Sequence, residues 1–233
     1  MHYHIDTIPI WDAYRNDGEC PLCDIRAHLE NKFLDFYIGD SVMEPANRIR
    51  TNKEGFCPAH FSMLYENEKK LPLALTAHTR LRYVMEQLEP ELQSLMTGLE
   101  RNDSERASKK IVEKLEAIST SCALCDDIDR HMERYMQTII RMWKKEKEFR
   151  SLFEGSRGFC LGHFRSMLET ARGELGSKQY AEFAGLLASI EKSALSRLDG
   201  EVEYFTLKFD YRNADKPWGT SRDSLGRLLG KFK

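Results

Sequence analysis

The sequence predicts an all-α fold made of two similar helical units, and three observations support this prediction. Apolar residues recur three and four positions apart, which places them on one face of a helix. A clear example is the set Ile128, Met132, Tyr135, Ile139 and Met142. Few segments show the alternation of polar and apolar residues that is typical of a strand. The third observation is a cysteine and histidine motif that occurs twice.

Each copy of the motif consists of a Cys-x-x-Cys pair and a later Gly-Phe-Cys-x-x-His segment. The first copy contains Cys20, Cys23, Cys57 and His60, and the second contains Cys122, Cys125, Cys160 and His163. The two copies are offset by 102 residues at the first cysteine and by 103 at the Cys-x-x-His. Such self-similarity is expected of a duplicated supersecondary unit. We therefore expect one helical repeat in residues 1–100, a second in 104–207, and a C-terminal arm in 208–233.

A long apolar stripe follows each Cys-x-x-His. The first is Leu81, Val84, Leu88, Leu92, Leu95 and Leu99, and the second is Phe183, Leu187, Ile190, Ala194, Leu198, Val202 and Phe205. Either stripe could be core or a seam against a partner helix, and core is the favoured interpretation. Pro90 interrupts the first stripe and is expected to kink or divide its helix.

The residue types of the motif indicate metal binding. Two ligands separated by two residues can grip one ion from a single turn, and three cysteines with one histidine form a complete tetrahedral set for zinc. We expect two zinc ions per chain, the first held by Cys20, Cys23, Cys57 and His60 and the second by Cys122, Cys125, Cys160 and His163. Exchange of pairs between the repeats is an open alternative, because the sequence does not say which pairs meet. We expect each Cys-x-x-His to open a helix.

Other cysteine chemistries are weaker interpretations. Disulfides would explain neither histidine, iron–sulfur clusters usually take all-cysteine ligation, and a thioredoxin-like pair would need a βαβ context. Four protein ligands also leave no open coordination position for hydrolysis. No phosphate-binding loop, nucleophile elbow or His-Glu-x-x-His helix is present in the sequence, so an enzyme is the less favoured interpretation.

Charge and hydropathy limit the partners and the compartment. The chain of 233 residues has 35 Lys and Arg against 37 Asp and Glu, a formal charge of −2. This balance does not indicate general attraction to nucleic acid or to an anionic membrane. No stretch approaches the roughly 18 apolar residues needed to span a bilayer. The N-terminal residues, from Met1 and His2 onward, show no secretory signal, and we expect a cytoplasmic protein.

The segment 208–233 differs in composition from the rest of the chain. It carries seven basic residues against three aspartates, interleaved with aromatic residues including Trp218. Aromatic and basic residues together are typical of a docking element for a protein or a nucleic acid. The favoured interpretation is instead an arm that folds back and buries Trp218 on the helical body.

The doubled motif, together with the closing Phe-Asp-Tyr-Arg and Lys-Pro-Trp-Gly segments, resembles a family of uncharacterised bacterial proteins classed as a domain of unknown function. The resemblance covers nearly the whole chain and implies a bacterial cytoplasmic protein with paired metal-binding motifs. It implies no activity, substrate or catalytic residue.

From these observations we expect a non-enzymatic interaction or regulatory module with two structural zinc sites and an unidentified protein partner. One alternative is a redox sensor in which oxidation of the thiolates releases zinc. A second is a nucleic-acid-binding protein that uses the basic arm. The sequence leaves the oligomeric state open.

Overall fold

The computed structural model describes residues 3–98 and 100–233. Met1 and His2, on which part of the expected lack of a leader rests, and Leu99 of the first stripe lie outside the described residues. Within the described ranges the chain forms α-helices and short 3₁₀ turns and no strand, so the all-α prediction is confirmed.

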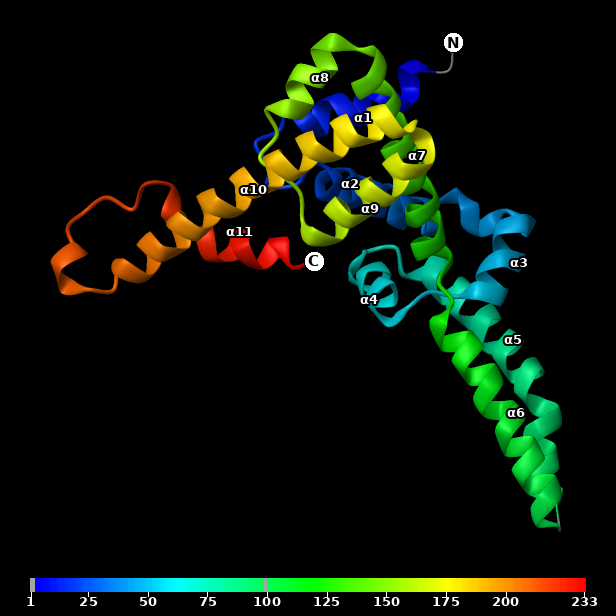
Figure 1. Ribbon diagram of the computed structural model, residues 1–233. Helices are drawn as coiled ribbons and strands as arrows, with labels where there is room; N and C mark the ends of the chain where they lie inside the picture. Colours follow the sequence, from blue (N-terminus) through cyan, green and yellow to red (C-terminus); the bar gives the residue numbers. More distant parts are fainter. Residues whose placement is uncertain (1–2, 99) are drawn as a thin grey trace. The chain divides into compact units, whose positions relative to one another are not determined.

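The helices follow one another with short connections (Figure 1). The first half contains α1 (Tyr3–Arg15), α2 (Pro21–Tyr37), η1 (Asp40–Met43), α3 (Pro45–Glu54), α4 (Pro58–Glu66), α5 (Lys70–Thr97) and α6 (Arg101–Thr120). The second half contains α7 (Ala123–Lys145), α8 (Lys147–Glu154), α9 (Leu161–Glu174), α10 (Ser177–Leu207), η2 (Tyr211–Asn213), η3 (Gly219–Ser221) and α11 (Ser224–Lys231). A long helix, a short helix, the helix opened by Cys-x-x-His and a second long helix follow each Cys-x-x-Cys in the same order.

The chain divides into two compact units, one inserted into the other. The first unit consists of Met1–His28 and His131–Lys233, and the second consists of Leu29–Arg130. Helices α2 and α7 each begin in one unit and end in the other. Neither unit coincides with a consecutive repeat at 1–100 or 104–207, so the duplication inferred from the motif stays a prediction.

The first unit has an aromatic core. Phe153 of α8 is fully buried and its ring contacts Tyr14, Phe149, Phe159 and Phe183, with centroids 5.5–6.4 Å away. Phe159 directly precedes Cys160 in the chain. The packing of α1, α8 and α10 therefore holds the backbone that presents this cysteine.

Helix α10 and the C-terminal arm complete the first unit. Five residues of the second stripe are buried, namely Phe183, Leu187, Ile190, Ala194 and Leu198, and their prediction as core is confirmed. The arm folds back so that η3 and α11 pack against α10 (Figure 1). Trp218 is half-buried and lies 5.6 Å from the ring of Phe205.

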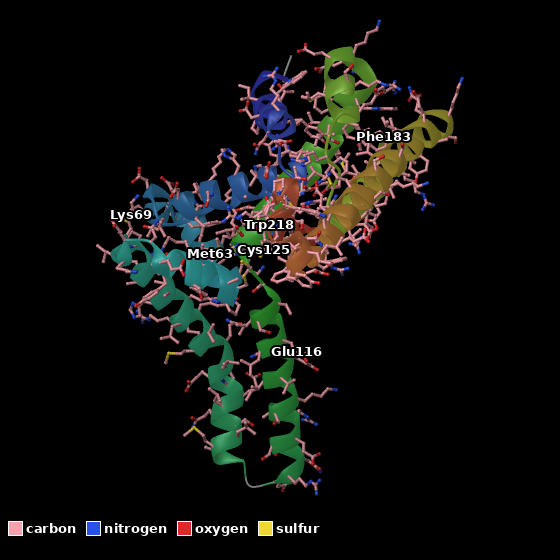
Figure 2. All side chains as sticks on the ribbon, turned by 90° about the vertical axis from the view of Figure 1, so that its left-hand side faces the viewer. Met63, Lys69, Glu116, Cys125, Phe183 and Trp218 are labelled. Atoms are coloured by element: carbon pink, nitrogen blue, oxygen red, sulfur yellow. The ribbon has the colours of Figure 1, made fainter. Side chains whose placement is uncertain are left out.

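The second unit contains a long antiparallel hairpin formed by α5 and α6 (Figures 1 and 2). Pro90 does not divide α5, which runs unbroken from Lys70 to Thr97. Pro90 and Glu86 are both exposed, so water can satisfy the Glu86 carbonyl that loses its helical hydrogen bond at Pro90.

The first stripe is not core. Leu81, Leu92 and Leu95 are exposed, while Val84 and Leu88 are half-buried. The favoured interpretation was wrong here, because a hairpin of two helices covers only the side of each helix that faces the other. Among the described residues, none of the helices has the length and hydropathy needed to cross a bilayer.

Removing the central ring of the aromatic core tests the packing of the first unit. We expect Phe153→Ala to lower the free energy of unfolding by about 3–5 kcal/mol, because it leaves a cavity in a fully buried site. Phe209→Ala, at a side chain 77% exposed, is the control and is expected to change it by less than about 1 kcal/mol. Denaturant titration gives both values, and equal effects would contradict the described core.

Candidate metal centre

The eight predicted ligand residues form two compact clusters among the residues that the structure describes. One contains Cys20, Cys23, Cys160 and His163, and the other contains Cys57, His60, Cys122 and Cys125. In each, the sulfur and nitrogen atoms all lie within 4.8 Å of one another. The structure therefore corrects the expected pairing, because each Cys-x-x-Cys meets the Cys-x-x-His of the other motif copy.

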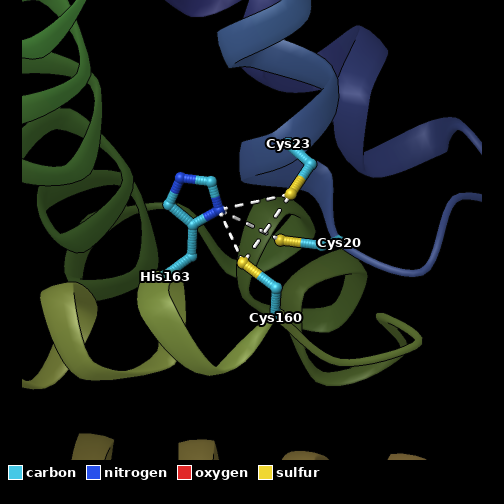
Figure 3. A group of neighbouring side chains, drawn as sticks. All are labelled: Cys20, Cys23, Cys160 and His163. Atoms are coloured by element: carbon cyan, nitrogen blue, oxygen red, sulfur yellow. Dashed lines mark hydrogen bonds between the residues drawn. The ribbon is translucent and has the colours of Figure 1, made fainter. Parts of the chain in front are cut away.

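The outer cluster, which combines Cys20 and Cys23 with Cys160 and His163, lies within the first unit (Figure 3). His163 Nδ1 lies 3.1 Å from Cys160 Sγ and 3.5 Å from the Sγ atoms of Cys20 and Cys23. The Sγ atoms of Cys23 and Cys160 are 3.7 Å apart. Figure 3 shows the three sulfurs and the imidazole nitrogen pointing toward a common centre.

The inner cluster, which combines Cys57 and His60 with Cys122 and Cys125, lies within the second unit. His60 Nδ1 lies 3.3 Å from the Sγ atoms of Cys57 and Cys122 and 3.4 Å from that of Cys125. The Sγ atoms of Cys57 and Cys125 are 4.0 Å apart. In both clusters the histidine therefore faces the sulfurs through Nδ1.

The other ring nitrogen of His60 has its own partner. Its Nε2 lies 3.1 Å from Oε1 of Glu30 on α2. A carboxylate there favours the tautomer that carries its proton on Nε2 and leaves the Nδ1 lone pair free for a metal. His60 is 4% exposed, so the contact fixes the ring within the protein interior.

Each ligand pair stands at the N-terminus of a helix. Cys20 and Cys122 directly precede α2 and α7, and Cys57 and Cys160 are the N-cap residues of α4 and α9. The expectation that Cys-x-x-His opens a helix is confirmed. Amide groups at a helix N-terminus stabilise thiolate, and the amide of Cys125 donates a hydrogen bond to Cys122 Sγ at 3.4 Å.

The distances fit a single tetrahedral ion. Zinc–sulfur and zinc–nitrogen bonds of about 2.3 and 2.0 Å imply sulfur pairs about 3.8 Å apart and nitrogen–sulfur pairs about 3.5 Å apart. The observed sulfur pairs at 3.7 and 4.0 Å and nitrogen–sulfur pairs at 3.1–3.5 Å are close to these values. All six cysteines are free rather than disulfide-bonded.

The pKa values of the inner cluster show that its groups compete for protons. Burial opposes ionisation of Cys122, yet its hydrogen bond with His60 lowers the pKa of this thiol to about 6. Burial and the neighbouring Cys122 raise the pKa of Cys125 to about 12. The hydrogen bond with Cys122 raises the pKa of His60 to about 9, against the effect of burial. Three thiolates so close together need a cation among them to coexist.

The outer cluster follows the same pattern. Hydrogen bonds with Cys20 and Cys23 lower the pKa of Cys160, whereas hydrogen bonds with Cys160 and Cys23 raise that of Cys20. Burial acts against protonation of His163, but its hydrogen bonds with Cys160 and Cys23 raise its pKa to about 9. The donor set of both clusters therefore fits a divalent metal that displaces protons on binding.

A buried charged side chain lies behind the glycine of each Gly-Phe-Cys turn. Gly55 has a φ of 65°, and a Cβ there would lie 2.7 Å from Nε of Arg80. The Arg80 guanidinium donates hydrogen bonds to the carbonyls of Asn52 and Lys53 at 2.7 and 2.5 Å, which holds the end of α3 just before the ligand turn.

Gly158, in the other turn, has a φ of 111°, and a Cβ there would lie 2.6 Å from Ala194 Cβ and 2.8 Å from Nζ of Lys231. Lys231 is 1% exposed. Its ammonium donates to the carbonyl of Phe159 at 2.8 Å and pairs with Glu191, which in turn accepts a hydrogen bond from the Phe159 amide. Glycine is required at both turns because the backbone and the charged groups approach so closely.

None of these supporting residues is among those predicted from the sequence. Glu191 is a charged residue within the second apolar stripe and Arg80 directly precedes the first, and such a charge beside apolar positions was the signal available. Glu30 and Lys231 stand among other charged residues and carry no such signal. The supporting cations come from α5 in one unit and α11 in the other, so comparison of the two motifs would not have found them.

We expect Gly158→Ala to lower the free energy of unfolding by at least about 1–3 kcal/mol, because the methyl group meets Ala194 and Lys231 and the backbone conformation is unfavourable. The matched control is Gly185→Ala on the exposed side of α10, where nothing lies within 4 Å of the added atom. This change is expected to stabilise by about 0.5–1 kcal/mol. Denaturant titration of both variants distinguishes them, and a neutral Gly158→Ala would contradict the close packing.

Comparisons with known proteins agree with the earlier resemblance. A curated relative, the "Uncharacterized 23.9 kDa protein in xynA 3'region" of Caldicellulosiruptor sp. (strain Rt8B.4), is 22% identical over 198 residues, which is 84% of this chain and 85% of the relative. No solved structure matches the chain. The model of the Family of unknown function (DUF6062) matches residues 1–233. The chain therefore belongs to this family of unknown function.

Proposed function

We propose that each cluster holds one structural zinc ion and that the protein is a metal-stabilised helical module for interaction or regulation, without catalytic activity of its own. The observation that carries this proposal is the tetrahedral spacing of three sulfurs and one imidazole nitrogen, found in both clusters. Such a set satisfies zinc fully with protein ligands, as in structural sites.

The number and spacing of the ligands support zinc over an iron–sulfur cluster. The four donor atoms surround a volume suited to one ion, whereas the cysteines of a cluster surround several metal and sulfide ions and stand further apart. Mixed sulfur and nitrogen ligands in a tetrahedron are typical of zinc. A filled coordination sphere gives substrate no position on the metal, which supports a structural role.

Metal content tests the central claim. We expect the untagged protein to contain two zinc ions per chain by elemental mass spectrometry and to show no rapidly reacting thiols. Zinc removal by a chelator is expected to expose the thiols and to reduce helicity, since binding free energy at structural sites is largely folding free energy. Iron, or full helicity without metal, would contradict the proposal.

The pairing of ligands across the two motifs can be tested with one substitution. We expect Cys57→Ser to reduce the zinc content from two ions to one and to destabilise the second unit by several kcal/mol. The thiols that become reactive should be Cys122 and Cys125, identified by alkylation and peptide mass spectrometry. Reactive Cys20 and Cys23 would instead indicate pairing within one motif. His78→Ala removes an exposed histidine outside both clusters and should change nothing.

The carboxylate beside His60 supports a prediction specific to one cluster. We expect Glu30→Gln to weaken zinc binding at the inner cluster by about 10-fold, because the carboxylate no longer orients the ring and raises its basicity. The outer cluster should keep its affinity. Chelator competition resolves the two sites, and Glu66→Gln on the exposed end of α4 is the control. Equal weakening at both sites would argue against the Glu30 contact.

A redox sensor is a second candidate, supported by one feature of both clusters. Cys23, Cys57 and Cys125 are only half-buried, so an oxidant can reach thiolates whose loss would release the metal. Mild peroxide should then release zinc in proportion to the disulfides formed, and a reductant with added zinc should restore helicity. Retention of zinc under these conditions would contradict the redox sensor and leave only the structural role.

The basic arm gives less support to nucleic-acid binding. Lys208 and Lys231 are buried, Arg212 pairs with Asp210 at 2.6 Å, and Arg227 pairs with Glu19 at 2.9 Å and Glu201 at 2.6 Å. These contacts engage four of the seven basic side chains with groups of the chain itself. Fewer cations therefore remain for a phosphate backbone, and we do not propose this function.

A further inference from the structure

The hairpin of α5 and α6 has a narrow and partly polar seam. The half-buried and buried positions on α6 are Ser104, Ala107, Ile111, Lys114 and Ile118, spaced alternately three and four apart. Across the seam, Lys114 Nζ pairs with Glu91 Oε2 at 2.6 Å. A seam with such small and charged members buries little apolar surface, so contacts between the two helices alone stabilise the hairpin weakly.

The larger apolar side chains of α5 lie beside this seam rather than in it. On a helical wheel with 100° per residue, the mean direction of these side chains about the α5 axis differs by about 100° from the mean direction of the α5 residues that face α6. They form one stripe made of Leu81, Met85, Leu88, Leu92, Leu95 and Met96. Five of these are exposed, from 36% at Leu95 to 80% at Met96.

Helix α6 continues the stripe on the same side of the hairpin. Val112 and Leu115 are 53% and 43% exposed. On the helical wheel of α6 they are rotated by about 90° from the seam positions, in the sense in which successive residues of the helix advance. The α5 stripe is rotated in the same sense from the side of α5 that faces α6. Because the two helices run antiparallel, these two rotations bring the α5 stripe and the two α6 residues to the same face of the hairpin. We call this surface, formed by the α5 stripe with Val112 and Leu115, the apolar hairpin face.

The opposite face of the hairpin is polar. It carries Tyr83, Gln87, Ser94, Asp103, Arg106 and Lys110. Side chains project from both helices along the length of the hairpin, and Glu116 is labelled on α6 in Figure 2. The two helices of the hairpin therefore share one apolar face and one polar face, as two adjacent helices of a four-helix bundle do.

The size of the apolar hairpin face suits a second copy of the same chain. Its exposed side chains present on the order of 600 Å² of surface, as large as the largest patch of a typical monomer and near the roughly 800 Å² that each partner buries in a standard interface. Two such faces together would supply a bundle core of four helices from two antiparallel hairpins.

The charges along the margins of this face favour a symmetric partner. The α5 margin carries Arg82, Glu86 and Glu89, and the α6 margin carries Arg101, Glu105, Lys109 and Glu116. In a twofold interface the same surface of each copy meets the other. The basic residues of a margin that carries both signs can therefore pair with the acidic residues of the second copy. A partner of one dominant charge would find like charges on each side.

We propose that the apolar hairpin face is covered by the same face of a second copy of this chain, giving a homodimer joined by a four-helix bundle. This inference rests on the proposed role as an interaction module and names its surface and partner. It does not require either metal cluster, because none of the eight ligands lies on α5 or α6.

Sedimentation equilibrium of the zinc-loaded full-length protein tests the dimer. We expect a dimer for the native chain, and at least about 100-fold weaker association for the double variant Met85→Lys and Val112→Lys, since the twofold axis places four lysines in the bundle core. Ala117→Lys is the matched control on the opposite side of α6, where Ala117 is also exposed, and it should remain dimeric.

Elemental mass spectrometry on the same samples separates the two proposals. All variants should keep the zinc content and helicity of the native chain. A monomeric native chain at micromolar concentrations, or a dimer unaffected by the double variant, would overturn the dimer. A chain without zinc that still forms a dimer sensitive to the double variant would overturn the structural metal sites and leave the hairpin interface standing.

Discussion

Three thiol sulfurs and an imidazole nitrogen converge within 4.8 Å in each of two places, and much of the structure is arranged around this convergence. Thiolates at such separations repel one another, and a cation among them turns the repulsion into attraction. Helix N-termini supply each ligand pair with amide groups that favour the ionised thiol. Because the four residues of each cluster come from segments far apart in the sequence, a metal ion bound there would also determine which parts of the chain must meet.

The two convergences are nested. The inner cluster brings together Cys57 and Cys125, and the segment between them contains α4, α5 and α6. The outer cluster brings together Cys23 and Cys160, which are 137 residues apart, and the segment between them contains the whole inner cluster. The compact units follow the same nesting, since Leu29–Arg130 is inserted between the two parts of the first unit. A cross-link that closes a long loop removes more conformational freedom from the unfolded chain than one that closes a short loop. On this argument a metal ion at the outer cluster would restrict the unfolded chain more than a metal ion at the inner cluster.

The helices, and the eight cysteine and histidine residues that gather in the two clusters, could be predicted from local sequence because both depend on short spacings. The Cys-x-x-Cys and Cys-x-x-His pairs each occupy one turn, and the apolar residues of α7 and α10 repeat with the helical period. Pairing could not be predicted, since His60 is compatible with Cys20 and Cys23 as readily as with Cys122 and Cys125. The exposure of Leu81 and Leu92 could not be predicted either, because the spacing of apolar residues in a helix does not indicate whether the same chain or another chain covers them. Arg80 and Lys231 act through backbone carbonyls that no spacing rule locates.

Nested pairing has a consequence for the growing chain on the ribosome, which releases residues from the N-terminus onward. The first complete set of three cysteines and one histidine to emerge is Cys20, Cys23, Cys57 and His60, and the folded protein contains no cluster made of these four. The inner cluster can close once Cys125 has emerged, whereas Cys20 and Cys23 must wait for Cys160 and His163. A metal ion bound early by this first set would have to be released before the two clusters of the folded protein could form. If the clusters hold zinc as proposed, its availability during synthesis would bear on the yield of correctly folded chains, and not only on the stability of the finished protein.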